Sequence, residues 1–189
     1  YNAFHHFENT GVSFSSDLSN IGLPFQRFFK SKRHLVRPAS EYYLLHRAYQ
    51  DKIDIKDNRI FKKLLIMYKD KLPDYQNQFF NERKRLLQEN NMKWLQLHNV
   101  YNSLVDHWGI LSKIFDIYIV SNKDKFSIIL LMDHFNLPIN EENIFGVENG
   151  IDKSIIIANI IESCSVELSN ISFIDDILDN LKSLENLNI

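Results

Sequence analysis

The chain of 189 residues contains a single cysteine, Cys164, and this scarcity excludes a disulfide within the chain. Disulfides persist in oxidising compartments, so a chain whose one thiol has no partner is compatible with a reducing cytoplasm. Cys164 ends an apolar stretch over residues 154–164 that we expect to form a helix. A cysteine in such a stretch is more often a small buried side chain than a nucleophile, so we predict a buried, unreactive thiol.

Long apolar runs are also missing. No segment approaches the roughly 20 consecutive apolar residues that span a bilayer. The first residues, Tyr1-Asn-Ala-Phe-His-His-Phe-Glu8, lack the basic and apolar regions of a secretory signal. The net charge is only −2 at pH 7, which gives the chain no general attraction to nucleic acid or to anionic lipid. We therefore predict a cytoplasmic protein without a nucleic-acid or membrane partner, and these features do not define its oligomeric state.

Zinc-binding patterns are absent from the seven histidines of the chain. No histidine pairs with another histidine or with a cysteine at the sequence spacing that zinc sites use on one helix or strand. We expect these histidines to be ordinary surface and core residues.

What the chain does contain is enough apolar material for a sizeable core. Hydrophobic residues make up 44% of the sequence, which at this length allows one core with an inserted lobe or two small domains. From about residue 15 to about residue 92, apolar residues recur every three or four positions, with breaks at Pro38, Pro73 and the pair Asn90-Asn91. This periodicity predicts a series of helices, over residues 41–49, 58–69, 74–90 and 92–112.

A basic segment, Lys30-Ser-Lys-Arg33-His34 followed by Arg37, lies within this helical region. Arginine presents a fixed fork of donors to phosphate or carboxylate, so the segment could hold an anionic group of a substrate. A solvated basic turn is the commoner explanation of such a run, and it is the one that we expect.

Three polar groups follow apolar segments in the last third of the chain. An apolar run over residues 115–120 has the pattern of a buried strand and ends on Ser121. A second run, over residues 171–174, ends on Asp175-Asp176, and between the two runs Gly150-Ile-Asp-Lys153 begins a predicted helix. In an open parallel sheet the ligand crevice lies beyond the carboxyl ends of the strands. We therefore expect a hydroxyl, an ammonium and two carboxylates to meet in one pocket.

This order of residues resembles the haloacid dehalogenase superfamily, whose commonest members are magnesium-dependent phosphatases. The segment Phe173-Ile-Asp175-Asp176-Ile-Leu-Asp179-Asn180 is similar to the fourth motif of the family, an apolar run followed by two aspartates, three residues and an asparagine. The start of the predicted helical region, Gly11-Val-Ser-Phe and then Gly22-Leu-Pro-Phe25, is similar to the beginning of the helical cap in the phosphoglycolate-phosphatase-like branch.

The resemblance implies an α/β fold. Its core would be a Rossmann-like parallel sheet built from residues 1–14 and 93–189, and residues 15–92 would form an inserted α-helical cap. The first and last strands that the family places in this sheet are not seen in the chain.

The resemblance also implies a site in which a hydroxyl and an ammonium bind a phosphoryl group beside a Mg²⁺ ion. Its members are Ser121 and Lys153 (catalytic and phosphate-binding), Asn122 (phosphate-binding), Asp175 and Asp176 (metal ligands) and Asn180 (supporting). Mg²⁺ prefers one or two carboxylates together with waters and phosphate oxygens. The implied reaction is hydrolysis of a small phosphorylated metabolite, a phosphate monoester, through an aspartyl-phosphate intermediate.

The nucleophile is the open point of this prediction. The family's Asp-x-Asp-Gly motif comes just before the first cap helix, so we expect it upstream of Tyr1. A rival alignment places Glu8 and Thr10 where the family has its two aspartates, although a Glu nucleophile carries one methylene too many for a site fixed to within about 0.5 Å. The alternative to a phosphatase is an inactive relative that lacks the nucleophile and binds a ligand or a partner with the same fold.

Each predicted role also has a plainer explanation. Ser121 would cap the helix that follows it, Asp175-Asp176 would stabilise the dipole of a helix that they begin, and Lys153 would be solvated. Lys123 or Lys125 is a further candidate for the role that we assign to Lys153. The order of all these residues together favours the phosphatase prediction.

Overall fold

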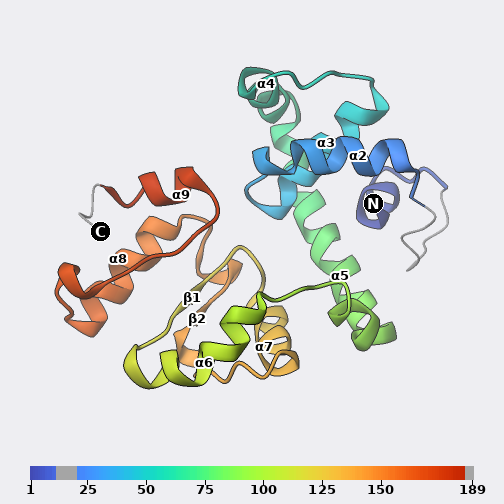
Figure 1. Ribbon diagram of the computed structural model, residues 1–189. Helices are drawn as coiled ribbons and strands as arrows, with labels where there is room; N and C mark the ends of the chain where they lie inside the picture. The colour runs from blue at the N-terminus through green and yellow to red at the C-terminus, as the bar shows by residue number, and fades with distance from the viewer. Residues whose placement is uncertain (12–20, 186–189) are drawn as a thin grey trace. The chain divides into compact units, whose positions relative to one another are not determined.

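The structure, a computed structural model, describes residues 1–11 and 21–185. The chain forms two compact units, unit 1 over Tyr1–Trp94 and unit 2 over Leu95–Ile189. Figure 1 labels the helices and strands of both units.

The described part of unit 1 contains helices joined by turns and short loops. They are α1 (Asn2–Phe7), α2 (Leu23–Lys32), α3 (Tyr42–Gln50), α4 (Asn58–Tyr68) and α5 (Leu72–Leu95), with 3₁₀ turns η2 (Arg33–Leu35), η3 (Ala39–Glu41) and η4 (Lys69–Lys71). The helices predicted from apolar periodicity over residues 41–49 and 58–69 are confirmed by α3 and α4.

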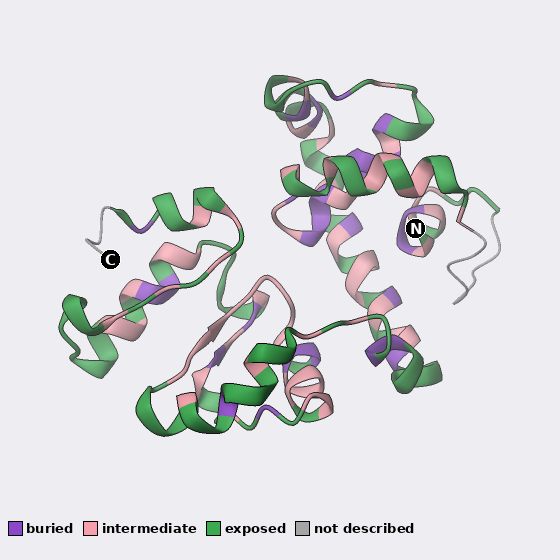
Figure 2. Cartoon of the chain, viewed as in Figure 1, coloured by how far each residue is buried: buried purple, intermediate pink, exposed green. Residues whose placement is uncertain are grey.

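Helix α3 forms the centre of the unit 1 core (Figure 2). Side chains on most faces of this helix are buried, as expected of a helix that is surrounded by other helices. Its buried residues are Tyr43, Leu44, Leu45, His46 and Ala48. Phe4 of α1, Phe61 and Leu64 of α4 and Tyr75 of α5 belong to the same buried cluster. The core of unit 1 is therefore built from its own helices.

Helix α5 contains a kink at Asn90, whose φ of −162° and ψ of 84° are not helical. The Asn90 side-chain oxygen accepts a hydrogen bond from the Lys93 backbone N–H at 2.9 Å, so it caps the last short stretch of helix. The break predicted at Asn90-Asn91 is confirmed. The helix predicted over residues 92–112 is wrong in its middle, because the chain leaves the helix after Leu95 and the next one begins at Asn102.

Unit 2 contains a short parallel sheet with helices packed on it (Figure 1). Its elements are α6 (Asn102–Ile114), β1 (Ile119–Val120), α7 (Lys125–His134), β2 (Ile144–Phe145), α8 (Lys153–Cys164) and α9 (Leu178–Lys182), with 3₁₀ turns η5 (Glu141–Asn143), η6 (Val147–Asn149) and η7 (Leu168–Asn170). Ile119 lies opposite Ile144 in the sheet, and Val120 lies opposite Phe145. Helix α7 packs against β2, and α8 packs against β1.

The predicted Rossmann-like parallel-sheet core is wrong. Of the described residues, 68% are helical and only 2% belong to strands, so the fold class is mostly helical. The run over residues 171–174, which we expected to be a strand, pairs with no strand in the described part of the chain. Ile174 is 93% exposed. A buried parallel strand needs a hydrogen-bonded neighbour and covered faces, and an apolar run of four residues does not guarantee either.

Two further expectations can be compared with the structure. Cys164 is exposed at the end of α8, so the predicted burial of its thiol is wrong. Within residues 1–11 and 21–185, none of the helices combines the length and the hydrophobicity that a bilayer crossing requires.

The predicted division into a core over residues 1–14 and 93–189 and a cap over residues 15–92 stays a prediction. In the structure, α1 packs into the unit 1 core through Ala3 and Phe4. Residues 12–14, part of the predicted core, lie outside the described residues.

Candidate functional site

Lys153 and Asp175 form the centre of the candidate site in unit 2. Lys153 is the first residue of α8, directly after the helix cap Asp152. Its ammonium donates a hydrogen bond to Oδ2 of Asp175 at 2.5 Å. The two side chains are only 15% and 5% exposed, so the ion pair is largely shielded from water. A paired charge of each sign is the usual way in which such groups are tolerated away from solvent.

Asp175 is held by two further donors. Its Oδ1 accepts hydrogen bonds from the Ile177 backbone N–H at 2.8 Å and from the Asn180 side-chain amide at 2.9 Å. Burial alone would raise the pKa of Asp175, but the hydrogen bonds from Lys153, Ile177 and Asn180 and the charge of Lys153 outweigh it and lower the pKa. Asp175 is therefore an ionised carboxylate at neutral pH with a fixed orientation.

Asp176 has a different environment from its neighbour. It is exposed and has no hydrogen bond or ion pair with other residues of the described chain. Its carboxylate oxygens are thus available to an external cation. Lys153, Asp175 and Asn180 are brought together by the fold, and Asp176 adjoins them through the backbone.

Ser121 follows β1 directly and is held by the backbone of the sheet. Its N–H donates to the Phe145 carbonyl at 2.9 Å, which extends the pairing of β1 with β2 by one bond. Its hydroxyl oxygen accepts a hydrogen bond from the Lys123 N–H at 3.1 Å. Because a serine hydroxyl both donates and accepts, the hydrogen of this hydroxyl remains available to a phosphoryl oxygen. Ser121 has no direct bond to the Lys153 group in the described residues.

Ser121 does not cap the helix that follows it. Helix α7 starts at Lys125, and Asp124 caps it by accepting from the Ser127 N–H at 2.8 Å. The Lys123 N–H donates its hydrogen bond to the Ser121 hydroxyl oxygen. Asn122 lies in this turn and is half-buried. Its phosphate-binding role stays a prediction.

A residue that the sequence reasoning missed, Glu148, contacts the start of α7. Both of its carboxylate oxygens accept from the Lys125 N–H at 3.2 Å. Gly146 permits this approach, because a Cβ there would lie 2.6 Å from the Lys125 nitrogen and 2.9 Å from the Lys123 carbonyl oxygen. No short motif marks this pairing, because it joins segments 23 residues apart.

The donor set of this site fits a magnesium ion that completes its coordination with water and phosphate oxygens. In residues 1–11 and 21–185, no group of three or more histidine, cysteine or acidic side chains could form a full metal cage. Mg²⁺ does not need one, because it usually keeps several waters and binds one or two carboxylates. Asp175 already accepts three hydrogen bonds, whereas Asp176 accepts none from the described residues. Asp176 is thus the better direct ligand.

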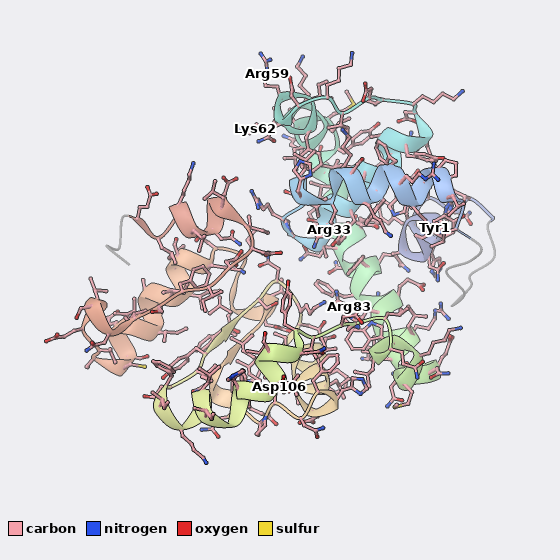
Figure 3. The ribbon with its side chains drawn as sticks, viewed as in Figure 1. Tyr1, Arg33, Arg59, Lys62, Arg83 and Asp106 are labelled. Carbon is pink, nitrogen blue, oxygen red and sulfur yellow. The ribbon has the colours of Figure 1, made fainter. Side chains whose placement is uncertain are left out.

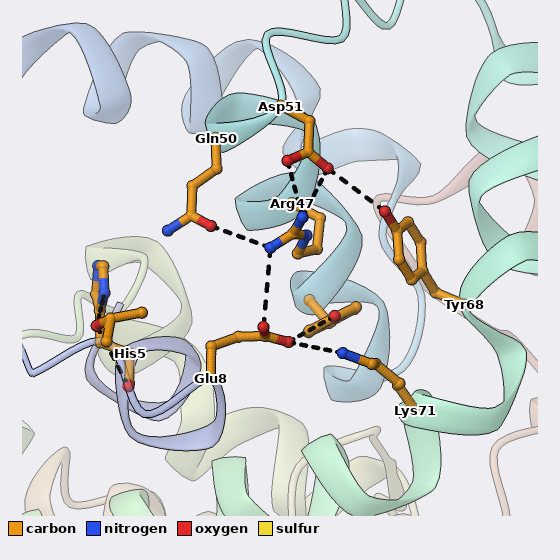
Figure 4. A network of polar contacts seen from close by, with 9 residues as sticks. His5, Glu8, Arg47, Gln50, Asp51, Tyr68 and Lys71 are labelled. Atoms are coloured by element: carbon orange, nitrogen blue, oxygen red, sulfur yellow. Dashed lines mark hydrogen bonds and ion pairs between the residues drawn. The ribbon is translucent and has the colours of Figure 1, made fainter.

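Glu8, the rival nucleophile, belongs to a polar network inside unit 1 (Figure 4). Its Oε1 accepts hydrogen bonds from the Tyr43 hydroxyl at 2.7 Å and from the Lys71 ammonium at 3.2 Å. Its Oε2 lies 3.8 Å from the Arg47 guanidinium. Burial would raise the pKa of Glu8, but these donors and charges together lower it. Glu8 follows the last turn of α1 and not a strand, and these contacts explain it as a structural carboxylate.

Comparison of the chain with protein-family models, with curated proteins and with solved structures found no match. The case for a function therefore depends on the side chains of the site and on the motif order in the sequence.

Proposed function

We propose that the protein is a Mg²⁺-dependent phosphatase that hydrolyses a small phosphorylated metabolite in the cytoplasm, with its phosphate- and metal-binding groups in unit 2. The observation that carries this proposal is the bonded group of Lys153, Asp175 and Asn180. These residues come from segments 22 residues apart, and the motif order that resembles the haloacid dehalogenase superfamily assigns them to one site. The resemblance supports only the residues of this site and not the fold of the family.

Lys153 and Ser121 would bind the phosphoryl group. An ammonium has three donors, and the bond to Asp175 uses one of them, so two remain for phosphoryl oxygens or for an attacking carboxylate. The Ser121 hydroxyl adds a neutral donor at the end of β1. In phosphoryl transfer the protein acts mainly by positioning and by neutralising charge on the equatorial oxygens, and these are the groups that such a role requires.

Asp176, with Asp175 beside it, would hold the Mg²⁺ ion, and Asn180 would keep Asp175 oriented by its hydrogen bond. When bound, the ion would neutralise the charge that the phosphate brings to two adjacent carboxylates. Lys153 already neutralises the charge of Asp175. The metal ion would therefore be needed chiefly to neutralise the charge of Asp176.

The proposed reaction runs in two displacements. An aspartate carboxylate attacks phosphorus, the bond from phosphorus to the ester oxygen breaks, and the leaving alkoxide takes a proton from water to become the alcohol. Water then attacks the aspartyl phosphate, which releases inorganic phosphate and restores the carboxylate. A covalent intermediate divides one difficult step into two easier ones. We assign neither displacement to Asp175, because the ion pair with Lys153 and two further hydrogen bonds hold its oxygens.

A binding protein without catalysis is the second candidate, and the contacts of Glu8 favour it. The one nucleophile candidate that the alignment finds within the chain is bonded to Tyr43 and Lys71 in unit 1. In this case the unit 2 site would bind phosphate and Mg²⁺ without turnover.

Asp176→Asn is the sharpest test, because Asp176 is exposed and we expect its replacement to leave folding intact. We expect the variant to lose Mg²⁺-dependent hydrolysis of an aryl phosphate by roughly 100-fold, since a lost metal ligand removes several kcal/mol of charge stabilisation. The unfolding midpoint without metal should not change. Asp116→Asn removes another exposed carboxylate of unit 2 and serves as the matched control.

Other outcomes separate the candidates. If the wild-type chain, with any native residues that precede Tyr1, is stabilised by Mg²⁺ and phosphate but shows no turnover, the binding protein is correct. Turnover that is lost in Glu8→Gln would support the rival nucleophile. Equal metal-dependent activity of Asp176→Asn and Asp116→Asn would contradict the proposed site.

A further inference from the structure

The two units of the chain carry opposite net charges. Unit 1 contains 17 lysine and arginine residues and 10 aspartate and glutamate residues, so its net charge is +7 with neutral histidines. Unit 2 contains 5 and 14 of these residues, so its net charge is −9. The value of −2 for the whole chain hides this difference. Our expectation of no nucleic-acid partner used the charge of the whole chain, whereas a compact unit attracts its partners through its own field.

One side of α2 concentrates part of the positive charge of unit 1. Arg27, Lys30 and Arg33 occupy every third position along α2 and η2, and all three are exposed. Between Ile21 and Ser40 the chain has no acidic residue. Residues three apart are neighbours on the surface of a helix, so the three cations form a row, which we call the α2 row. Figure 3 labels Arg33 at the end of this row.

The cations of the α2 row keep donors for an external acceptor. Arg27 and Lys30 have no hydrogen bond or ion pair with other residues of the described chain. The guanidinium carbon of Arg33 lies 5.0 Å from the centroid of the Tyr42 ring, and its Nη1 donates to the Val36 carbonyl at 3.2 Å. Arg33 also bonds to the Tyr42 hydroxyl. A guanidinium has five N–H donors, so these contacts orient Arg33 without using all of them.

The aromatic residues of α2 lie on its other side. Phe28 and Phe29 pack against the unit 1 core, and the ring of Phe25 stacks on that of His46 with centroids 4.8 Å apart. Within the described residues of α2 and η2, the one exposed large apolar side chain is Leu23. Proteins that bind single strands stack the bases on exposed rings, and helices that adsorb to membranes insert several apolar side chains. The α2 row lacks both features and presents cations to solvent.

We propose that the α2 row binds the phosphate backbone of double-stranded DNA without reading its base sequence. Members of the row lie about 4.5 Å apart along the helix axis, and each strand of the duplex carries a phosphate about every 3.4 Å. Long arginine and lysine side chains span this difference. The net charge of +7 of unit 1 adds a general attraction to the polyanion. The surface lies within unit 1 and does not depend on the function proposed for unit 2.

Fluorescence anisotropy of a labelled DNA duplex, titrated with the full chain, tests this surface. Three phosphate contacts predict an affinity that falls roughly 40-fold between about 50 and about 200 mM salt, because each contact releases counterions. Arg27→Gln and Lys30→Gln should each weaken binding roughly tenfold at the lower salt concentration and make it less dependent on salt. Lys62→Gln is the matched control, since it removes an exposed positive charge of unit 1 from α4 (Figure 3), and it should bind DNA nearly like the wild type.

Other variants and ligands complete the test. Asp176→Asn should bind the duplex like the wild type, so failure of the proposed phosphatase and failure of this surface are distinguishable. Absence of duplex binding by the folded wild-type chain at low salt, or equal affinities of Lys30→Gln and Lys62→Gln, would overturn the proposal. Tighter binding of a single strand than of the duplex would overturn it in favour of a single-strand site. Sedimentation with phosphatidylserine vesicles that is lost in Lys30→Gln, without binding of the duplex, would overturn it in favour of a membrane surface.

Discussion

His46 shows how the surroundings of one residue determine its chemistry. Its imidazole is buried in α3, with the rings of Phe4 and Phe25 stacked at 4.7 Å and 4.8 Å between centroids. Burial lowers the pKa of His46 well below 6.5, and the nearby positive charge of His5 acts in the same direction. The folded chain therefore keeps this imidazole neutral at pH values where the unfolded chain binds a proton.

We predict from this that the free energy of unfolding falls as the pH drops below about 6.5, because the unfolded state then binds a proton that the folded state does not bind. His46 should contribute a slope of up to about 1.4 kcal/mol per pH unit to the free energy of unfolding. Urea unfolding of His46→Phe between pH 7.5 and 5.5 should show a shallower slope than the wild type. The exposed His34 provides the control, and His34→Phe should keep the wild-type slope. An unchanged slope in His46→Phe would refute the explanation.

At the scale of single elements, the N-terminus of α7 depends on one side chain. Asp124 accepts hydrogen bonds from the N–H and the hydroxyl of Ser127, both at 2.8 Å, and Ser127 is fully buried. Loss of the cap would leave buried donors unsatisfied beside the turn that carries Ser121. The helix start and the candidate site are therefore coupled through this cap.

Replacement of Asp124 by alanine should lower the free energy of unfolding by about 1–3 kcal/mol, because it removes a helix cap and leaves buried donors without an acceptor. Asp124→Asn should cost less, since the amide oxygen can still accept from the Ser127 N–H. Chemical denaturation followed by circular dichroism measures both changes. The exposed Asp133 near the end of α7 gives the comparison, and Asp133→Ala should be close to neutral. Equal stability of Asp124→Ala and Asp133→Ala would rule out the cap.

At the scale of the whole molecule, each unit has buried residues of its own, and residues 96–101 between α5 and α6 are not helical. Tyr101 in this connection is 81% exposed. Exposed non-helical segments between compact units are preferred sites of proteolysis.

Brief digestion with chymotrypsin should therefore cleave after Leu97 or Tyr101 before it cleaves inside α3. Mass spectrometry of the first fragments identifies the bonds that are cut. The variant Tyr101→Ser removes the most exposed aromatic residue of the connection and should slow the release of the two fragments. First cuts inside α3, whose side chains are buried, would contradict the division into units.

The sequence by itself determined the helices of unit 1 and the kink at Asn90, because apolar periodicity and Asn-rich breaks act locally along the chain. It also defined the order of Ser121, Lys153 and Asp175 on which the proposed function depends. The sequence led to a wrong prediction of the sheet, because an apolar run such as residues 171–174 becomes a strand only when another strand pairs with it.

Only the tertiary structure decided which polar groups meet. The bonds of Lys153 to Asp175 and of Glu148 to the start of α7 join residues from different elements, and no local pattern encodes them. The same holds for the exposure of Cys164 and the burial of His46. Burial and pairing arise when distant segments pack, because the free energy of a charged or apolar group depends on the groups around it more than on its neighbours in sequence.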